Sequence, residues 1–235
     1  MGYFYDFHVH SNECSGCAAS SAREQVRGCK AKGYAGFVLT NHFLSGNNCV
    51  PKDLSWAERV GAYWNAYLEA KDEGEKLDFD VFFGIEHHYG NGQEILIYGI
   101  DLDFLVANPD FCQISAEEIC ERVHAHGGFV SHAHPYRERG YIPKGDFHMN
   151  FDYLDAIEIY NSGNLENEDI RAQELCKKLD LAYTAGNDLH YTPHLDNFPN
   201  AGLEFDFRIR TDAELLDALR NRKGRLKYSG ERYFK

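Results

Sequence analysis

Short apolar runs that alternate with helix-start signals constrain the fold of this chain most strongly. The helix starts carry Ser or Thr with Glu three residues later, which is the capping-box pattern: Ser21–Glu24, Ser55–Glu58, Ser115–Glu118 and Thr211–Glu214. The runs between them read as strands, and they cover 3–10, 36–40, 80–85, 129–131, 156–160 and 182–185. A further run at 93–100 follows a Gly90-Asn91-Gly92 turn and predicts a hairpin-like return, and 202–209 predicts a last strand. Strands that alternate with helices predict an α/β architecture.

Histidines and acidic residues stand where these strands end. His8 and His10 lie two apart on the first strand, so their side chains point to the same face. The other groups are Thr40-Asn41-His42, Gly84-Ile85-Glu86, His132-Ala133-His134-Pro135 and Gly186-Asn187-Asp188-Leu189-His190. A doubly wound sheet gathers its site at one crevice, whereas an α/β barrel builds its site from many strand ends. The pattern therefore favours a closed barrel.

Length and charge set outer bounds on the function. A chain of 235 residues suits one domain. Its formal net charge of −13 makes nucleic acid an unexpected partner, because binding to phosphates depends on Lys and Arg. No apolar run approaches the length of a membrane span, so we expect no membrane partner. The oligomeric state leaves no sequence signal.

The cysteines predict a reducing environment. The seven cysteines are Cys14, Cys17, Cys29, Cys49, Cys112, Cys120 and Cys176, an odd number, and the start of the chain does not resemble a signal peptide. We interpret them as reduced thiols of a cytoplasmic protein. Cys14 and Cys17 are spaced like half of a zinc knuckle, but no second CxxC follows.

The residue types at the strand ends suit metal-assisted hydrolysis. That chemistry needs histidines for affinity, a carboxylate that bridges ions, and an open position where water ionises near neutral pH. Glu86 is the natural bridge because it ends a strand. Mixed His and carboxylate ligands accept zinc, manganese and iron alike, so the metal stays open.

In these motifs the chain resembles the PHP superfamily, named for polymerases and histidinol phosphatases, over nearly its whole length. The elements that carry the resemblance are Asp6-Phe7-His8-Val9-His10-Ser11, Thr40-Asn41-His42, Gly84-Ile85-Glu86, Ala133-His134-Pro135, Ala156-Ile157-Glu158-Ile159-Tyr160-Asn161 and Gly186-Asn187-Asp188-Leu189-His190. The resemblance implies a stand-alone metal-dependent phosphoesterase with two to three divalent ions, zinc, manganese or iron. We therefore expect residues 1–235 to form a single α/β domain, a distorted (βα)7 TIM-like barrel.

The resemblance also implies a distribution of ligands. The first metal would take His8, His10, Glu86 and Asp188; Glu86 would bridge to a second metal on His134; and His42, His190 and a residue of the loop after His10 would hold a third. In that loop family members often carry Asp or His where this chain has Ser15 or Gly16, and Glu13 is the expected substitute, with Cys14 second. The family histidine before the glycine of the next strand is missing from Leu96-Ile97-Tyr98-Gly99, which leaves the second metal short of a ligand or completed by His132. Asn41 stands where the family often has Asp.

The predicted reaction is hydrolysis of a small phosphorylated substrate by a hydroxide that bridges two ions, with Asp188, Glu86 and Arg137 as the catalytic residues. Arg137 follows His134 by three residues and is the candidate for holding a phosphate, since guanidinium binds its oxygens in a bidentate manner. His194 could act as the general acid or remain a loop histidine. Asn161 could bind substrate or orient a neighbouring ligand.

Two other classes of function stay open. The same metal ligands could hydrolyse C–N or C–O bonds in an amidohydrolase-like reaction. Alternatively, the chain could be a non-catalytic metal-binding module, which complete loss of the ligands would mark.

Overall fold

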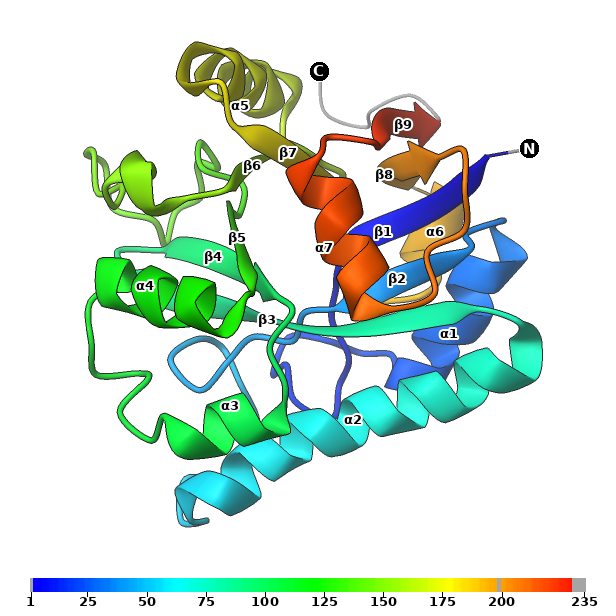
Figure 1. Cartoon of the computed structure of the whole chain (residues 1–235), viewed down its shortest axis with the longest axis horizontal. Helices are drawn as coiled ribbons and strands as arrows, with labels where there is room; N and C mark the ends of the chain where they lie inside the picture. The colour runs from blue at the N-terminus through cyan, green and yellow to red at the C-terminus, as the bar shows by residue number, and fades with distance from the viewer. Residues whose placement is uncertain (1, 198–199, 230–235) are drawn as a thin grey trace.

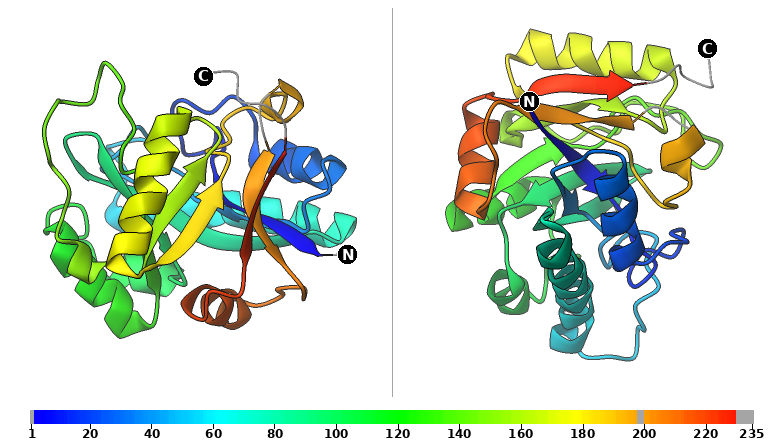
Figure 2. Two further views of the ribbon diagram at one scale, coloured as in Figure 1. Left: turned by 90° about the horizontal axis from the view of Figure 1, so that it is seen from above. Right: turned by 90° about the vertical axis from the view of Figure 1, so that its right-hand side faces the viewer.

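The computed structural model describes residues 2–197 and 200–229 and shows a barrel-like sheet surrounded by helices (Figures 1 and 2). The strands are β1 (Tyr3–Val9), β2 (Gly36–Leu39), β3 (Asp80–Gly90), β4 (Gln93–Tyr98), β5 (Phe129–His132), β6 (Ala156–Asn161), β7 (Ala182–Gly186), β8 (Asn200–Phe205) and β9 (Arg225–Ser229). The helices are α1 (Ala22–Ala31), α2 (Trp56–Leu77), α3 (Leu102–Ala107), α4 (Ala116–His126), α5 (Glu166–Leu179), α6 (His194–Asn197) and α7 (Asp212–Arg220), and a short 3₁₀ helix, η1, spans Phe151–Tyr153. No helix in the described ranges is long and apolar enough to cross a membrane.

The strands form one sheet in the order β7-β6-β5-β4-β3-β2-β1-β8-β9. β1, β2 and β3 pair in parallel, as do β5, β6 and β7, whereas β4 lies antiparallel between β3 and β5. The sheet nearly closes, because β7 lies against β1 and a parallel bridge joins Val9 to Leu189 just beyond it. The predicted distorted α/β barrel is thus confirmed.

Local structure departs from a regular strand–helix repeat in three places. The hairpin at Gly90-Asn91-Gly92 is confirmed and makes β4 antiparallel, so no helix separates β3 from β4. The last predicted strand ends at Phe205 instead of Ile209, whose backbone N–H donates to the Tyr5 hydroxyl. Helix α3, which the sequence analysis missed, begins after Asp101, whose side chain caps it.

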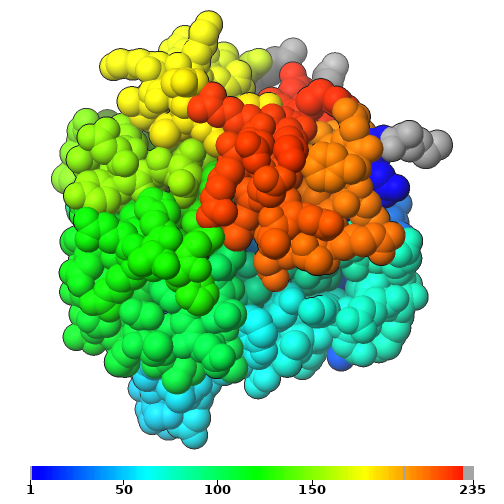
Figure 3. Space-filling view, viewed as in Figure 1, coloured from blue at the N-terminus to red at the C-terminus, as the bar shows by residue number. Residues whose placement is uncertain are grey.

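The predicted helix starts are confirmed. The side chains of Ser21, Ser55, Ser115 and Thr211 each accept the backbone N–H three residues later. These helices place their apolar faces on the sheet, and α4, α5 and α7 cover much of the surface on the side shown in Figure 3.

Helix α7 closes the amino-terminal end of the barrel. Its leucines, Leu215, Leu216 and Leu219, are buried in one cluster with side chains from the beginnings of the parallel strands, such as Tyr5 and Phe82. This end is filled by apolar contacts, which leaves the carboxyl end for polar side chains.

A bulge in β1 sets which of its side chains reach the carboxyl end. The register of β1 on β2 shifts between Asp6 and Val9. Phe7 packs in the apolar cluster at the amino-terminal end, whereas the neighbouring His8, together with His10, faces the polar end. The Asp6 carboxylate holds the shift, since it accepts the backbone N–H of His8 at 3.0 Å and of Asn187 at 3.0 Å.

Gly202→Ala and Gly61→Ala should change stability in opposite directions. A Cβ at Gly202 would lie 2.1 Å from the Tyr5 carbonyl oxygen in the neighbouring strand, so overpacking should lower the free energy of unfolding by about 1–3 kcal/mol. Among the described residues, no atom beyond its chain neighbours and the nearby helix backbone lies within 4 Å of a Cβ at Gly61 in α2, so alanine should raise the free energy of unfolding by about 0.5–1 kcal/mol through its helix propensity. Equilibrium urea unfolding measures both values, and equal effects would contradict the packing of β8 on β1.

Candidate metal centre

Ligand-type side chains from five parts of the sheet meet at the carboxyl end of the barrel. β1 brings His8 and His10; the segment after β2 brings His42; β3 brings Glu86; and the segments after β5 and β7 bring His134, Asp188 and His190. Positions far apart in the chain are joined there by short contacts, such as the isolated bridge between His42 and Glu86.

Glu86 lies at the middle of the group. Its Oε1 lies 3.1 Å from both His8 Nε2 and His134 Nε2, and its Oε2 lies 2.6 Å from His42 Nδ1. The side chain is fully buried. Burial opposes its ionisation, but His8 and His42 outweigh burial and hold the pKa of Glu86 well below its usual range. The carboxylate is thus ionised and shared by three imidazoles.

Asp188 forms the second acidic point of the group. Its Oδ1 lies 3.1 Å from His10 Nε2 and 3.5 Å from His8 Nε2, while its Oδ2 accepts from Arg137 at 2.7 Å. Burial opposes ionisation here too, but His8 and Arg137 keep the pKa of Asp188 well below its usual range. Asp188 has φ +54° and His134 has φ +25°. Positive φ is costly for residues other than glycine, and strain of this kind concentrates at functional sites.

Glu158 orients two of the histidines. Its Oε1 lies 2.9 Å from His8 Nδ1, and its Oε2 accepts the backbone N–H of His134 at 2.8 Å. Because a carboxylate only accepts, His8 Nδ1 donates to Glu158, and His8 Nε2 faces Glu86 and Asp188. A carboxylate behind a ligating histidine is the usual device for fixing the ring of a metal ligand.

A serine fixes His10 in the same way. The Ser11 N–H donates to Asn41 Oδ1 at 2.6 Å, which sets the orientation of that amide, and the Ser15 hydroxyl also donates to Asn41 Oδ1, at 2.9 Å. Ser15 Oγ must then accept from His10 Nδ1, 3.1 Å away, which leaves the Nε2 lone pair of His10 facing Asp188. Asn41 therefore orders the loop that supports His10.

The unpartnered atoms of the group match a metal site. Among the described residues, His8 Nε2, His10 Nε2 and Glu86 Oε2 are buried without a hydrogen-bond partner, although such atoms are normally paired. His8 Nε2 lies 3.1 Å from Glu86 Oε1, and His10 Nε2 lies 3.5 Å from Glu86 Oε2. Sets of three ligand atoms within 4.8 Å of one another include His8 with His10 and Asp188, and His42 with Glu86 and Glu94. Lone pairs aimed at a common space fit divalent cations.

Glu94 lies where the sequence analysis found no further ligand for the second metal, two residues before Leu96. Its two carboxylate oxygens lie 3.6 Å from His42 Nδ1 and 3.5 Å from His134 Nε2. Glu94, Leu96 and Tyr98 alternate along β4, so they share its inner face, and the two apolar residues are buried in the barrel. Burial and then the nearby Glu86 raise the pKa of Glu94 to about 8. A lone acidic residue in an apolar strand was the available signal. His132 does not face the group, because its Nε2 lies 2.7 Å from the Tyr89 hydroxyl.

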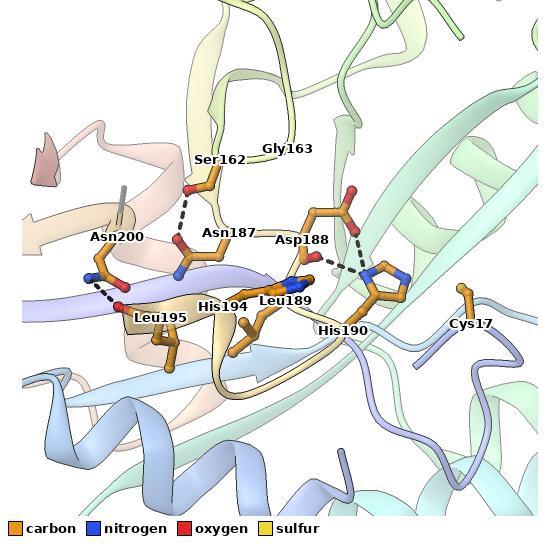
Figure 4. A pocket seen from close by; sticks show the side chains of 10 residues that line it. All are labelled: Cys17, Ser162, Gly163, Asn187, Asp188, Leu189, His190, His194, Leu195 and Asn200. Atoms are coloured by element: carbon orange, nitrogen blue, oxygen red, sulfur yellow. Dashed lines mark hydrogen bonds and ion pairs between the residues drawn. The ribbon is translucent and has the colours of Figure 1, made fainter. Parts of the chain in front are cut away.

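The loop after His10 presents a different side chain from the two that were expected. The Glu13 carboxylate accepts the backbone N–H of Ala22 at 3.0 Å, at the start of α1, and Cys14 is buried in the apolar core. Cys17 instead lines a pocket together with His190 (Figure 4). Burial opposes ionisation of this thiol, but the imidazoles of His190 and His42 lower the pKa of Cys17 to about 6. None of the seven cysteines, all within the described ranges, forms a disulfide.

The three predicted substrate-binding residues lie in different surroundings. Arg137 lies beside the group and donates to Asp188. The Asn161 amide is engaged on both sides, donating to Glu158 at 3.0 Å and accepting from Gly163 at 2.9 Å. His194 lines a pocket of about 380 Å³ that opens next to Asp188 (Figure 4). Their roles stay predictions.

The proteins that match this chain were found among solved structures. No protein-family model matches the sequence, and no curated protein does. A two-domain protein from Bacteroides vulgatus ATCC 8482, containing a predicted PHP-like metal-dependent phosphoesterase, matches with a TM-score of 0.74 at 15% identity, over 97% of this chain and 65% of its own. An amidohydrolase from Chromobacterium violaceum, with bound sulfate and no metal, matches with a TM-score of 0.59 at 14% identity, over 91% of this chain and 96% of its own.

A lesion-specific endonuclease also shares the fold. Endonuclease Q from Pyrococcus furiosus matches with a TM-score of 0.63 at 14% identity, over 97% of this chain and 58% of its own. This chain therefore spans less than two thirds of the length of the Bacteroides protein and of the endonuclease.

The exclusion of nucleic acid on the basis of net charge is wrong. An endonuclease Q structure that matches with a TM-score of 0.63 at 13% identity holds a 27-mer duplex with an abasic lesion at its active site. Net charge averages over the whole surface, whereas phosphate contacts depend on the local field at the site. The net charge of −13 is thus no ground for excluding a phosphodiester substrate.

These likenesses identify the fold. The sheet order, the site at the carboxyl end of the barrel and the solved neighbours agree with the motifs from which the PHP resemblance was drawn. The chain has the fold of PHP-like metal-dependent phosphoesterases.

Proposed function

We propose that this chain is a metal-dependent hydrolase that cleaves a phosphate ester of a small molecule, with residues 1–235 acting as one domain. The observation that carries the proposal is the convergence of buried, unpartnered ligand atoms at the carboxyl end of the barrel. The likeness to the predicted phosphoesterase of the Bacteroides protein supports the class of reaction.

In this proposal the ligands divide into three groups. His8, His10, Glu86 and Asp188 hold one ion; Glu86, Glu94 and His134 hold a second; and His42 with His190 contributes to a third. Divalent ions in these positions supply Lewis acidity and a nucleophilic water at neutral pH. Glu86 and Asp188 also keep a net negative charge beside the imidazoles, which favours cation binding.

Arg137 is proposed to hold the phosphate. Its Nε donates to Asn164 Oδ1 at 2.9 Å and one terminal nitrogen donates to Asp188 at 2.7 Å. The other terminal nitrogen is buried without a partner among the described residues. A guanidinium that is fixed on two sides is preorganised to donate to a phosphate oxygen and to offset its developing charge.

The pocket beside Asp188 suits the leaving group of a small substrate. Its volume of about 380 Å³ lies in the range of small-molecule sites. Leu189 and Leu195 give it an apolar part, and His194 lies at its wall, where we propose that the imidazole protonates the leaving oxygen (Figure 4). Asn161 acts in this proposal by holding Glu158.

An amidohydrolase-like reaction is the second candidate. The sulfate-containing amidohydrolase structure shares the fold, and the same ligands would serve C–N hydrolysis.

Asp188→Asn should abolish hydrolysis, because it removes a charged ligand and the partner of Arg137. Metal content is measured by elemental analysis of protein purified without chelator, and activity on a panel of phosphomonoesters, phosphodiesters, amides and duplex DNA with an abasic lesion. Asp53→Asn, at an exposed position, serves as the control. Activity of the wild type on small phosphoesters that Asp188→Asn lacks supports the proposal. Activity confined to DNA or to amides would replace its substrate class, and a loaded wild type that hydrolyses nothing would contradict it.

Glu94→Gln should lower the number of tightly bound ions by one, because it leaves the second group with only Glu86 and His134. Glu75→Gln, at an exposed position of α2, should leave the metal content unchanged. The measurement is the metal-to-protein ratio after dialysis against a weak chelator. An unchanged ratio in Glu94→Gln would show that Glu94 is no ligand.

Arg137→Gln should lower kcat/KM for a phosphoester by about 10²–10³-fold, the usual effect of removing one preorganised donor, while metal content stays the same. Steady-state kinetics together with elemental analysis separate the two effects. Loss of metal along with activity would assign Arg137 to support of Asp188 instead.

A further inference from the structure

Two carboxylates outside the candidate ligand groups are buried in the first turn of α5. Glu168 and Asp169 are each only 1% exposed. Acidic residues suit the first turn of a helix, but burial to this degree is costly unless the carboxylate accepts hydrogen bonds. The partners of these two side chains therefore show what each carboxylate holds in place.

Glu168 holds the backbone next to Arg137. Its Oε1 accepts the backbone N–H of Glu138 at 2.7 Å and Nη1 of Arg139 at 2.9 Å. Its Oε2 accepts the backbone N–H of Leu165 at 2.7 Å, at the start of the helix. Because Glu138 directly follows Arg137 in the chain, this carboxylate ties the segment that carries the proposed phosphate-binding guanidinium to α5.

Asp169 holds the side chain of Arg137 through one intermediate residue. Asp169 Oδ1 accepts from Asn164 Nδ2 at 2.7 Å, and Asn164 Oδ1 accepts from Arg137 Nε at 2.9 Å. Because a carboxylate only accepts and a guanidinium only donates, a single orientation of the Asn164 amide satisfies both neighbours. Asn164 is 3% exposed, so water has little access to compete for either bond.

The way in which Arg137 is held decides where its remaining nitrogen points. Nη1 donates to Asp188 Oδ2 at 2.7 Å, and Nη2 is buried without a hydrogen-bond partner among the described residues. Gly163 and Asp188 line the same pocket (Figure 4), and a Cβ added at Gly163 would lie 3.3 Å from Nη2 of Arg137. With Nε and Nη1 fixed, the planar guanidinium presents Nη2 at the wall of that pocket.

We propose that Asp169 is a positioning residue, which acts through Asn164 to fix the Arg137 guanidinium with one nitrogen toward the pocket where phosphate binds. The inference rests on the proposed function, because Arg137 holds the phosphate there, and it adds a residue that touches neither metal ligand nor substrate. Asp169 also accepts the backbone N–H of Asn161 at 3.3 Å, and the Asn161 side chain donates to Glu158. A test must therefore separate the route through Arg137 from a route to the metal ligands through Glu158.

A double-mutant cycle on the binding of inorganic phosphate tests the positioning role without an activity assay. In the metal-loaded protein, Asp169→Ala should weaken phosphate binding about 10-fold, the lower end of the cost of removing an outer-shell partner at a metal site. In an Arg137→Gln background the same change should have no further effect, because its route runs through Arg137. Isothermal titration calorimetry measures the four dissociation constants. Equal losses in both backgrounds, or a wild type that binds no phosphate, would overturn the inference.

Exchange of the two groups provides a second test, which does not depend on the folding of Asp169→Ala. Asn164→Asp alone places two carboxylates at hydrogen-bond distance, so repulsion should turn residue 164 away from Arg137 and weaken phosphate binding. Asn164→Asp combined with Asp169→Asn again sets a donor against an acceptor and still offers Arg137 an oxygen. The double variant should therefore bind phosphate more tightly than Asn164→Asp, and equal affinities would contradict the inference.

Metal content and a matched control separate the remaining explanations. Glu166→Ala removes an exposed acidic residue from the same helical turn and should leave the affinity for phosphate unchanged. The metal-to-protein ratio should be the same in Asp169→Ala and in the wild type, and a lower ratio would assign Asp169 to the route through Glu158. Failure of the proposed function is distinguishable: coupled phosphate binding in a protein that hydrolyses no phosphoester refutes the reaction and leaves the positioning role, and hydrolysis with equal losses in both backgrounds does the reverse.

Discussion

The barrel buries the carboxylates of Glu86, Asp188 and Glu158 among imidazoles. The fold depends on pairing these buried negative charges with neighbouring polar side chains. Buried charges are costly unless they are paired and hydrogen-bonded. Glu158 is satisfied by its contacts to His8, His134 and Asn161, whereas Glu86 lies among the imidazoles of His8, His42 and His134. Glu158 thus orients two of the histidines, and Glu86 lies at the middle of the group.

The backbone departs from regular strand geometry at the points where it positions these side chains. The shift in β1 turns His8 and His10 to one end, and the Asp6 carboxylate holds that shift. His134 and Asp188 adopt positive φ just beyond their strands. At the opposite end α7 fills the barrel with leucine side chains. One end of the molecule is thus packed for stability, and the other holds strained, polar segments.

The sequence analysis predicted the fold class and most of the side chains that cluster at the carboxyl end of the barrel. Its errors arise where a local pattern does not specify the position of a side chain or of a charge. The clustering of residues that follow parallel strands, such as His42 and Asp188, was predicted because carboxyl ends of parallel strands meet at one end of a barrel. Glu94 was missed because it lies at the beginning of β4, which reaches that end only because β4 runs antiparallel. The Glu13 carboxylate, the expected ligand of the loop, accepts a backbone N–H at the start of α1, because spacing cannot show which way a loop side chain turns. The charge argument against nucleic acid failed because composition does not locate charge.

By itself the sequence determined the alternation of strands and capped helices and the presence of metal-ligand chemistry at the strand ends, because both follow from local periodicity and residue type. Only the tertiary structure decided which lone pairs meet. The ring orientations of His8 and His10 depend on Glu158 and Ser15, and the place of Cys17 in the same pocket as His190 depends on how the loop after β1 lies at the barrel mouth. Such contacts join residues that are distant in the chain, and no local pattern specifies them.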